Sequence, residues 1–197
     1  MFTGIIQITE KAETIEKNAE SIKMSFLIPQ GWELVEGESI NIDGVCSTVK
    51  QLNQNSFSVY YMEETLEKTT IASLDKNHTF NLERSLTLQS LIGGHLVSGH
   101  IDTTGKVEKI EEVEDAKVLT FSIKEKFTKY IISKGSIALN GVSLTVVAIN
   151  ATSFTVSLIP YTLTHTNLGE LKTGDFVNIE VDMIGKYVEK MVTPVVS

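Results

Sequence analysis

The chain has 197 residues, of which 42% are hydrophobic and 21% charged, and its formal net charge is −8 at pH 7. This composition is typical of a globular protein, and the negative charge argues against nucleic acids and anionic membrane surfaces as partners. No apolar run reaches the length of a membrane span, and the N-terminus lacks the features of a secretory signal. The single cysteine, Cys46, cannot form an internal disulfide, so we expect a cytoplasmic protein.

Segments with the pattern of strands follow one another along most of the chain. Polar and apolar residues alternate at 39–42, 56–60, 136–139 and 153–156. Turn-forming residues such as Asp43-Gly44 lie between these segments. Short strands at regular spacing favour an all-β barrel or sandwich, and closure into a barrel removes the exposed edges of a small sheet.

The predicted helices are short. One helical turn is expected at 62–66 and another at 160–163, where Pro160 suits the first turn. A further helix is predicted at 127–132.

The tail is predicted to form a helix from Gly185 that Pro194 ends. Its apolar side chains fall on one face of that helix. They are Tyr187, Val188, Met191 and Val192. Because so short a helix is marginal in isolation, we expect this face to pack against a neighbour.

The sequence repeats itself at a spacing of 97 positions. The matching segments are Ser39-Ile40 and Ser136-Ile137, Gly44-Val45 and Gly141-Val142, Thr48-Val49 and Thr145-Val146, Phe57 and Phe154, Thr65-Leu66 and Thr162-Leu163, and Asn81-x-Glu83 and Asn178-x-Glu180. A repeat of this length suits a small domain. The sequence therefore predicts two similar domains, 1–88 and 89–184, followed by a tail at 185–197. Two such domains are suited to handling two copies of one molecule.

Differences between the two copies indicate where chemistry could lie. Cys46 in the first copy stands where Ser143 stands in the second. A cysteine can act as a nucleophile if its thiolate is stabilised, but a lone cysteine is also a common small buried residue. Similarly, Asp182 stands where the first copy has Ser85. This carboxylate could orient a base, or it could simply cap a turn.

Histidine marks another difference, since His100 follows Ser98-Gly99 where the first copy has Ile5 after Thr3-Gly4. An imidazole can transfer a proton near neutral pH, although a structural role is equally open. No metal site is expected, because His95 and His100 would point to opposite faces of one strand and no ligand cluster completes a site. The other two histidines, His78 and His165, are interpreted as surface or loop residues.

Long blocks of the sequence resemble the riboflavin synthase family of the α-chain type. The resemblance extends over essentially the whole chain in the same order. The blocks are Met1-Phe2-Thr3-Gly4-Ile5, Asp43-Gly44-Val45-Cys46 with Thr48-Val49, Gly93-Gly94-His95-Leu96-Val97-Ser98-Gly99-His100-Ile101-Asp102, Asn140-Gly141-Val142-Ser143-Leu144-Thr145-Val146, Leu158-Ile159-Pro160-Tyr161-Thr162-Leu163 and Asn178-Ile179-Glu180-Val181-Asp182.

The resemblance implies two tandem six-stranded antiparallel Greek-key barrels and a short C-terminal helix. It also implies the dismutation of two 6,7-dimethyl-8-ribityllumazine molecules into riboflavin and 5-amino-6-(D-ribitylamino)uracil, without a metal or an organic cofactor. Family members are usually homotrimers whose active site lies between the N-terminal barrel of one subunit and the C-terminal barrel of the next. Lumazine synthase is a further candidate partner. The alternative is a non-catalytic, fluorescent lumazine-binding antenna protein, which the same family resemblance would also fit.

The resemblance further assigns site residues. The catalytic candidates are His100, Cys46, Asp182 and Ser143. The candidate substrate-binding residues are Gly4, Ile5, Ile6, Ser39, Cys46, Ser47, Thr48, Tyr60, Tyr61, Met62, Glu63, Glu64, Thr65, Gly99, His100, Ile101, Lys134, Ser143, Leu144, Thr145, Ile159, Pro160, Tyr161, Thr162, Leu163 and Thr164.

Two departures from the family pattern stand out. The family usually has an apolar residue after the cysteine, whereas this chain has Ser47; the second copy keeps Leu144 at that point. A local change in packing is expected there. The tail is also shorter than usual, so assembly of the oligomer could be weaker or differently arranged.

Overall fold

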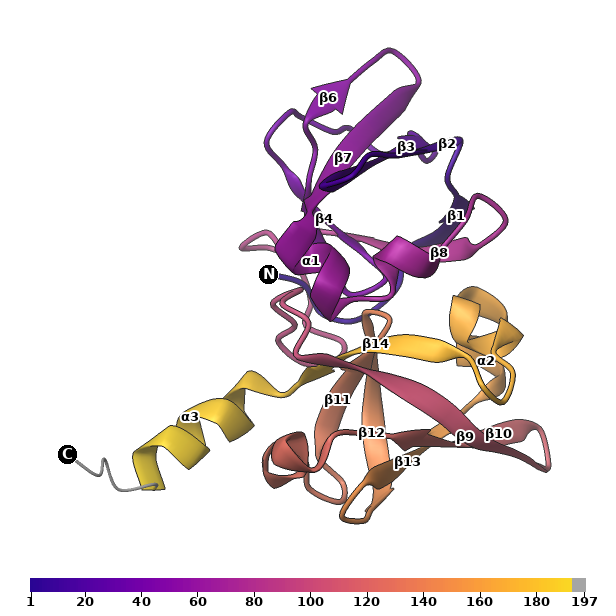
Figure 1. Cartoon of the computed structure of the whole chain (residues 1–197), viewed down its shortest axis with the longest axis vertical. Coiled ribbons are helices and arrows are strands. Elements are labelled where there is room, and N and C mark those ends of the chain that lie inside the picture. Colours follow the sequence, from indigo (N-terminus) through magenta and orange to yellow (C-terminus); the bar gives the residue numbers. More distant parts are fainter. Residues whose placement is uncertain (193–197) are drawn as a thin grey trace.

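The computed structural model describes residues 1–192 as two β-rich halves, one above the other, with a C-terminal helix that projects away from both (Figure 1). The N-terminus lies close to the boundary between the halves (Figure 1). The prediction of an all-β protein is therefore confirmed. No helix among these residues has the length and apolar character that crossing a membrane requires.

The second half forms a closed barrel of six antiparallel strands. Its strands are β9 (Thr103–Val113), β10 (Ala116–Ser122), β11 (Ser136–Leu139), β12 (Val142–Ile149), β13 (Ser153–Leu158) and β14 (Phe176–Val181). Neighbouring strands around the barrel follow the order β10-β13-β12-β11-β14-β9. Strand β9 then pairs with β10 and closes the circle, as the sequence predicted for this half.

The first half consists of two four-stranded sheets, β1-β8-β4-β5 and β2-β3-β7-β6. Its strands are β1 (Ile8–Lys11), β2 (Thr14–Lys17), β3 (Ser21–Leu27), β4 (Ser39–Ile42), β5 (Val45–Thr48), β6 (Gln51–Leu52), β7 (Ser56–Met62) and β8 (Thr79–Arg84).

The two sheets of the first half follow the path of the second-half barrel with two strands interrupted. Strands β1 and β2 together take the place of β9, and β5 and β6 together take the place of β12. Main-chain hydrogen bonds bridge both interruptions: the amide of Glu13 donates to Ser25 over 2.8 Å, and the amide of Lys50 donates to Ser58 over 2.9 Å. The repeat in sequence is thus a repeat in strand order. The predicted closed six-stranded barrel is found in the second half only; the first half, called the first barrel below, has the same strand order divided between two sheets.

Each half has its own apolar core, built on the alternation that predicted the strands. Phe26 stacks on Phe57 with 5.5 Å between ring centroids, and Phe121 stacks on Phe154 at 5.6 Å. All four rings are fully or almost fully buried. Because Phe57 and Phe154 are equivalent in the repeat, the same stacking arrangement occurs in both cores.

Helical segments lie at the rims of the barrels. The α-helices are α1 (Glu63–Lys68), α2 (Pro160–His165) and α3 (Met183–Val192), and the 3-10 helices span Ile71–Ser73, Glu125–Tyr130 and Asn167–Glu170. Helices α1 and α2 match the predicted turns. The helix predicted at 127–132 is a 3-10 helix that begins and ends two residues earlier.

The tail helix begins earlier than predicted, at Met183 instead of Gly185. The reason is the side chain of Asp182, whose Oδ1 accepts a hydrogen bond from the amide of Ile184 over 2.9 Å. That bond satisfies an amide that the first turn of a helix leaves unpaired. Pro194, which was predicted to end the helix, lies outside the described residues.

Candidate functional site

Residues 98–101, which precede the second barrel in the sequence, cross over and lie against the first barrel. We call them the crossing segment. Glu180 of β14 accepts hydrogen bonds from the amide of Ser98 over 2.7 Å and from the amide of Gly99 over 2.8 Å. The carbonyl of Gly99 in turn accepts from the amide of Cys46 on β5 over 2.8 Å. Ile101 packs against the core of the first barrel. A glutamate of the second barrel therefore holds a segment that covers the first.

The N-terminal segment makes the reciprocal connection. Glu83 of β8 accepts from the amide of Thr3 over 2.7 Å and from the amide of Gly4 over 3.1 Å. The carbonyl of Gly4 accepts from the amide of Ser143 on β12 over 2.8 Å. Ile6 packs against the second core. The two crossings are equivalent, which makes the pairs Gly99–Cys46 and Gly4–Ser143 equivalent as well.

Only glycine fits at either crossing. Gly99 has φ +81°, and a Cβ added there would lie 2.7 Å from Cys46 Cβ and 2.8 Å from the Cys46 amide nitrogen. Gly4 has φ +75°, and an added Cβ would lie 2.6 Å from Ser143 Cβ. The missing side chains let the crossing segments lie directly on the strands that carry the thiol and the hydroxyl.

A cavity of about 230 Å³ opens beside Cys46 on the first barrel. Its lining residues are Val45, Cys46, Glu64, Thr65, Lys68, Thr69, Gly99, His100 and Ile101. We call this cavity the Cys46 pocket. Strand β5 supplies one wall, α1 the second, and the crossing segment the third. The pocket brings together two predicted catalytic residues, Cys46 and His100, with four residues predicted to bind substrate.

The pocket combines a partly buried thiol with an exposed imidazole. On its α1 wall, Lys68 Nζ lies 2.5 Å from Glu64 Oε1. The hydrogen bond and charge of Lys68 lower the pKa of Glu64, while Glu64 raises the pKa of Lys68. Both side chains therefore stay charged near neutral pH and can form hydrogen bonds with a polyhydroxylated ligand. Lys68, Thr69 and Val45 also line the pocket, and they were not among the predicted binding residues.

Ser143 lies at the equivalent place on the second barrel, beside a histidine that sequence reasoning missed. His95 Nδ1 lies 2.7 Å from Ser143 Oγ. Burial lowers the pKa of His95, although the charges of Asp182 and Glu180 oppose that shift. The lowered pKa favours the neutral imidazole, which can donate or accept in its hydrogen bond with Ser143 according to its tautomer. In the sequence His95 was considered only as a metal ligand, since its contact with Ser143 spans 48 residues.

Two residues predicted to bind substrate face the barrel interior instead. Ser47 and Tyr61 are each 2% exposed, and Ser47 Oγ lies 2.8 Å from Tyr61 Oη. Alternation along β5 explains this placement, because Cys46 points outward and its neighbour must point inward. Neither residue lines the Cys46 pocket.

The other predicted residues are distributed over several surfaces. Tyr60, Met62 and Glu63 are exposed around the start of α1. Exposed positions also include Ile5, Thr48, Lys134, Thr145, Ile159, Pro160, Tyr161 and Thr164, whereas Ser39, Leu144, Thr162 and Leu163 are partly buried. Lys134 lies in a turn with φ +67° before β11. Asp182 lines a separate groove of about 320 Å³ between α3 and the 3-10 helix Glu125–Tyr130.

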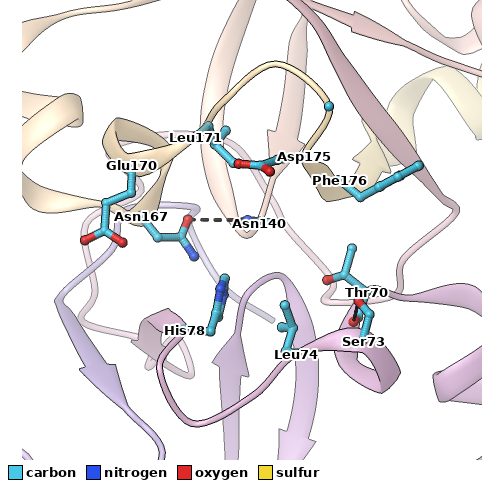
Figure 2. Close-up of a pocket in the computed structure, with 11 residues that line it drawn as sticks. Thr70, Ser73, Leu74, His78, Asn140, Asn167, Glu170, Leu171, Asp175 and Phe176 are labelled. Atoms are coloured by element: carbon cyan, nitrogen blue, oxygen red, sulfur yellow. Dashed lines mark hydrogen bonds between the residues drawn. The ribbon is translucent and has the colours of Figure 1, made fainter.

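A cavity of about 360 Å³ lies between the two barrels, and His78 points into it (Figure 2). His78 lies in a loop, as interpreted from the sequence, but it is partly buried and its Nε2 is 2.7 Å from Oδ2 of the buried Asp43. Asp43 Oδ1 also accepts from the side-chain amide of Asn167 in the second barrel over 2.7 Å. Asp43 thus joins the two barrels through its hydrogen bond to Asn167.

This ion pair predicts a pH-dependent stability. Burial alone would lower the pKa of His78, but the hydrogen bond and charge of Asp43, with smaller contributions from Glu170 and Asp75, give a net increase. A raised pKa in the folded state means that protonation stabilises the fold below the unfolded pKa of about 6.5, and this stabilisation is lost as pH rises through the folded value. We therefore expect the free energy of unfolding, measured with urea, to decrease between pH 6 and pH 9.

A matched pair of variants isolates the contribution of His78. His78→Leu is expected to cost roughly 2 kcal/mol at pH 6, because it leaves an oxygen of buried Asp43 without its partner, and to remove most of the slope. His165→Leu, which deletes an exposed histidine on α2, is expected to keep the slope. An unchanged slope in His78→Leu would contradict the assignment.

Comparison with known proteins agrees with this architecture. The lumazine binding domain family matches residues 3–85 and again 98–182. Riboflavin synthase of Actinobacillus pleuropneumoniae is 41% identical over 191 residues, which cover 96% of this chain and 89% of the relative. The chain belongs to the riboflavin synthase family. Another member, riboflavin synthase of Bacillus subtilis (strain 168), is 39% identical over 188 residues, covering 95% of this chain and 87% of the relative.

Solved structures of LumP have the same fold as this chain. The crystal structure of LumP complexed with riboflavin has a TM-score of 0.83 and 26% sequence identity, and covers 92% of this chain and 100% of that one. LumP complexed with 6,7-dimethyl-8-(1'-D-ribityl) lumazine has a TM-score of 0.80, 26% identity and coverage of 92% and 99%. The chain thus shares its fold with a protein that was crystallised with riboflavin in one structure and with a lumazine in another.

Proposed function

We propose that this protein is a riboflavin synthase, which converts two molecules of 6,7-dimethyl-8-ribityllumazine into riboflavin and 5-amino-6-(D-ribitylamino)uracil. A four-carbon unit passes from one lumazine to the other, so the atoms balance without an external oxidant or reductant. The observation that carries the proposal is the 41% identity to a riboflavin synthase over 96% of the chain. The two-barrel architecture supports it, because the reaction consumes two identical molecules.

The Cys46 pocket is the proposed site for one lumazine. Gly99, His100 and Ile101 would contact it from the crossing segment, and Glu64 and Thr65 from α1. The second lumazine would bind at the equivalent surface of a neighbouring subunit, where Gly4 lies against Ser143. Support comes from LumP, a relative in fold that was crystallised with a lumazine.

Four residues are proposed to act on the reacting atoms. The 7-methyl protons of a lumazine are acidic because the conjugate base is delocalised over the ring, and His100 would remove one of them. Cys46, or a water beside it, would attack the electrophilic ring carbon of the partner lumazine. Ser143 would hold the second ring, and Asp182 would orient the groups around it. Fixing two substrates face to face supplies much of the rate gain.

The decisive experiment follows both lumazine and riboflavin. Purified protein is incubated with 6,7-dimethyl-8-ribityllumazine without oxygen, and the products are separated by chromatography. Two lumazines consumed for each riboflavin formed is the expected result. A stable fluorescent complex without product would overturn the proposal and indicate the antenna function of a LumP-like protein.

We further propose a cytoplasmic homotrimer, with residues 1–88 and 89–184 as the lumazine-binding units and 185–197 as the assembly element. Supporting this, the apolar side chains of α3 are exposed, Tyr187 by 63% and Met191 by 81%. Exposed apolar surface of this kind favours association with another copy. Association with lumazine synthase would require a second binding surface on the trimer. Mixing the purified trimer with lumazine synthase would test for it.

Deletion of 186–197 is expected to convert trimers into monomers in sedimentation velocity, because it removes that apolar surface. Lys190→Glu changes only a charged side chain of α3 and is expected to preserve the trimer. If the truncated protein sediments as the full-length chain does, the tail is not the assembly element.

A further inference from the structure

A buried polar pair includes Ser47, the residue that follows Cys46 in β5. Ser47 Oγ and Tyr61 Oη are 2.8 Å apart, and both residues are 2% exposed. At the equivalent places in the second barrel, the repeat has Leu144 and Leu158, both of which belong to or pack against the apolar core. The same fold therefore tolerates two leucines here. The first barrel has polar residues in place of both leucines, and one of them, Ser47, is next to Cys46 in the sequence.

The direction of the hydrogen bonds follows from the donors available. Burial raises the pKa of Tyr61 well above its ordinary value, so the phenol keeps its proton. Ser47 Oγ also lies 2.9 Å from the carbonyl oxygen of Val45, which can only accept. Ser47 must then donate to Val45, and Tyr61 must donate to Ser47. The result is a chain from a tyrosine hydroxyl through a serine hydroxyl to the main chain of β5.

These hydrogen bonds connect two walls of the Cys46 pocket. Val45 and Ser47 are the residues on either side of Cys46 in β5. Tyr61 lies near the end of β7, two residues before α1 begins at Glu63. Helix α1 carries Glu64 and Thr65 into the pocket. The pair thus links the strand that bears the thiol to the element that leads into the facing wall.

A hydrogen bond constrains this link in a way that leucines do not. Hydrogen-bond energy falls off steeply with distance and angle, whereas contacts between aliphatic side chains persist through small sliding movements. A satisfied buried hydrogen bond adds only about 1 kcal/mol to stability. Stability is therefore a poor reason to replace an apolar pair, and a fixed geometry is a better one.

We propose that Tyr61 and Ser47 are positioning residues, which fix the Cys46 thiol of the first barrel relative to α1. The proposal rests on the proposed function for its catalytic consequence, because the pocket must bind lumazine for the position of the thiol to affect turnover. The expected effect on the reactivity of the Cys46 thiol does not depend on the proposed function, because it follows from the geometry alone.

Thiol reactivity tests the geometry without catalysis. The chain has one cysteine, so alkylation of the native protein by iodoacetamide reports on Cys46 alone. Tyr61→Phe and Ser47→Ala each remove one hydroxyl from the chain of bonds. Each is expected to change the alkylation rate constant by about threefold or more, as loss of one buried hydrogen bond of ordinary strength allows. The kcat of each variant is expected to fall by a similar factor, with little change in KM.

A control on the same barrel separates position from stability. Ser58 is 4% exposed on β7, and its hydroxyl bonds to Gln51 Oε1 over 3.3 Å, away from the pocket lining. Ser58→Ala removes a buried hydroxyl at comparable cost in Tm and is expected to alkylate and turn over as the native protein does. Ser47→Leu with Tyr61→Leu copies the second barrel, and it is expected to recover Tm without recovering the native alkylation rate.

The outcomes distinguish this proposal from the proposed function. Native alkylation rates in Tyr61→Phe and Ser47→Ala would overturn the positioning role, whatever the activity. If Ser58→Ala shifts the rate as much as they do, the effect is general loosening of the barrel and the positioning role is likewise overturned. If alkylation shifts as expected but no form of the protein makes riboflavin, the positioning role stands and the proposed function fails.

Discussion

Replacing His100 with alanine is expected to lower kcat by about 100-fold or more, the size of effect that loss of a general base produces. His100 is exposed and lines the Cys46 pocket, and its main chain is held by a hydrogen bond from its amide to Ser98 Oγ over 3.2 Å. Within residues 1–192, the imidazole belongs to none of the apolar core clusters. The variant is therefore expected to fold normally and to bind lumazine with nearly native affinity.

His100→Gln is the informative companion to this variant. Glutamine keeps a polar side chain of similar reach but cannot take up a proton near neutral pH. If His100 transfers a proton, both variants are slow in single-turnover measurements with lumazine. Native single-turnover rates in His100→Gln would show that the imidazole only forms a hydrogen bond. Native rates in His100→Ala would remove it from the mechanism.

The sequence predicts those parts of the fold that depend on local pattern and repetition. Alternation at 39–42 and 136–139 predicts strands that the structure contains, and the spacing of 97 positions predicts the common strand order of both halves. The interrupted strands of the first half were not predicted. After Val49 the first copy has Lys50-Gln51 where the second has Val147-Ala148, and this polar substitution was not interpreted as a break.

The site is less accessible to sequence reasoning, because contacts distant in sequence create it. Glu180 holds Ser98 over a separation of 82 residues, and His95 meets Ser143 over 48. A shared Asn-x-Glu motif was visible in both copies, but its role in holding the crossing segment of each barrel could not be derived from spacing. One signal was available for Ser47: its departure from the apolar pattern kept by Leu144 pointed to a packing change, and the structure supplies Tyr61 as its partner.

Gly99→Ala is expected to destabilise the fold and to remove the Cys46 pocket in the same step. The new Cβ would lie 2.8 Å from the amide nitrogen of Cys46, and the backbone there has φ +81°. Strain of a non-glycine residue in that conformation costs about 1–2 kcal/mol, and overpacking against the β5 main chain adds about 1–3 kcal/mol. Separation of the crossing segment from β5 would relieve the clash and move His100 away from Cys46.

Gly37→Ala supplies the matched control. Gly37 has φ +88°, yet an added Cβ there would meet no atom within 4 Å. It therefore carries the backbone strain without the clash, and is expected to cost about 1–2 kcal/mol while leaving lumazine binding intact.

Urea unfolding and fluorescence titration with lumazine measure the two quantities separately. Gly99→Ala is expected to lose both stability and binding, whereas Gly37→Ala loses only stability. Equal binding by both variants would mean that the crossing segment does not form the pocket. Gly4→Ala, which places its Cβ 2.6 Å from Ser143 Cβ, extends the comparison to the second barrel. If its defect is confined to one of the two lumazines bound, each glycine governs the site of the barrel that it covers.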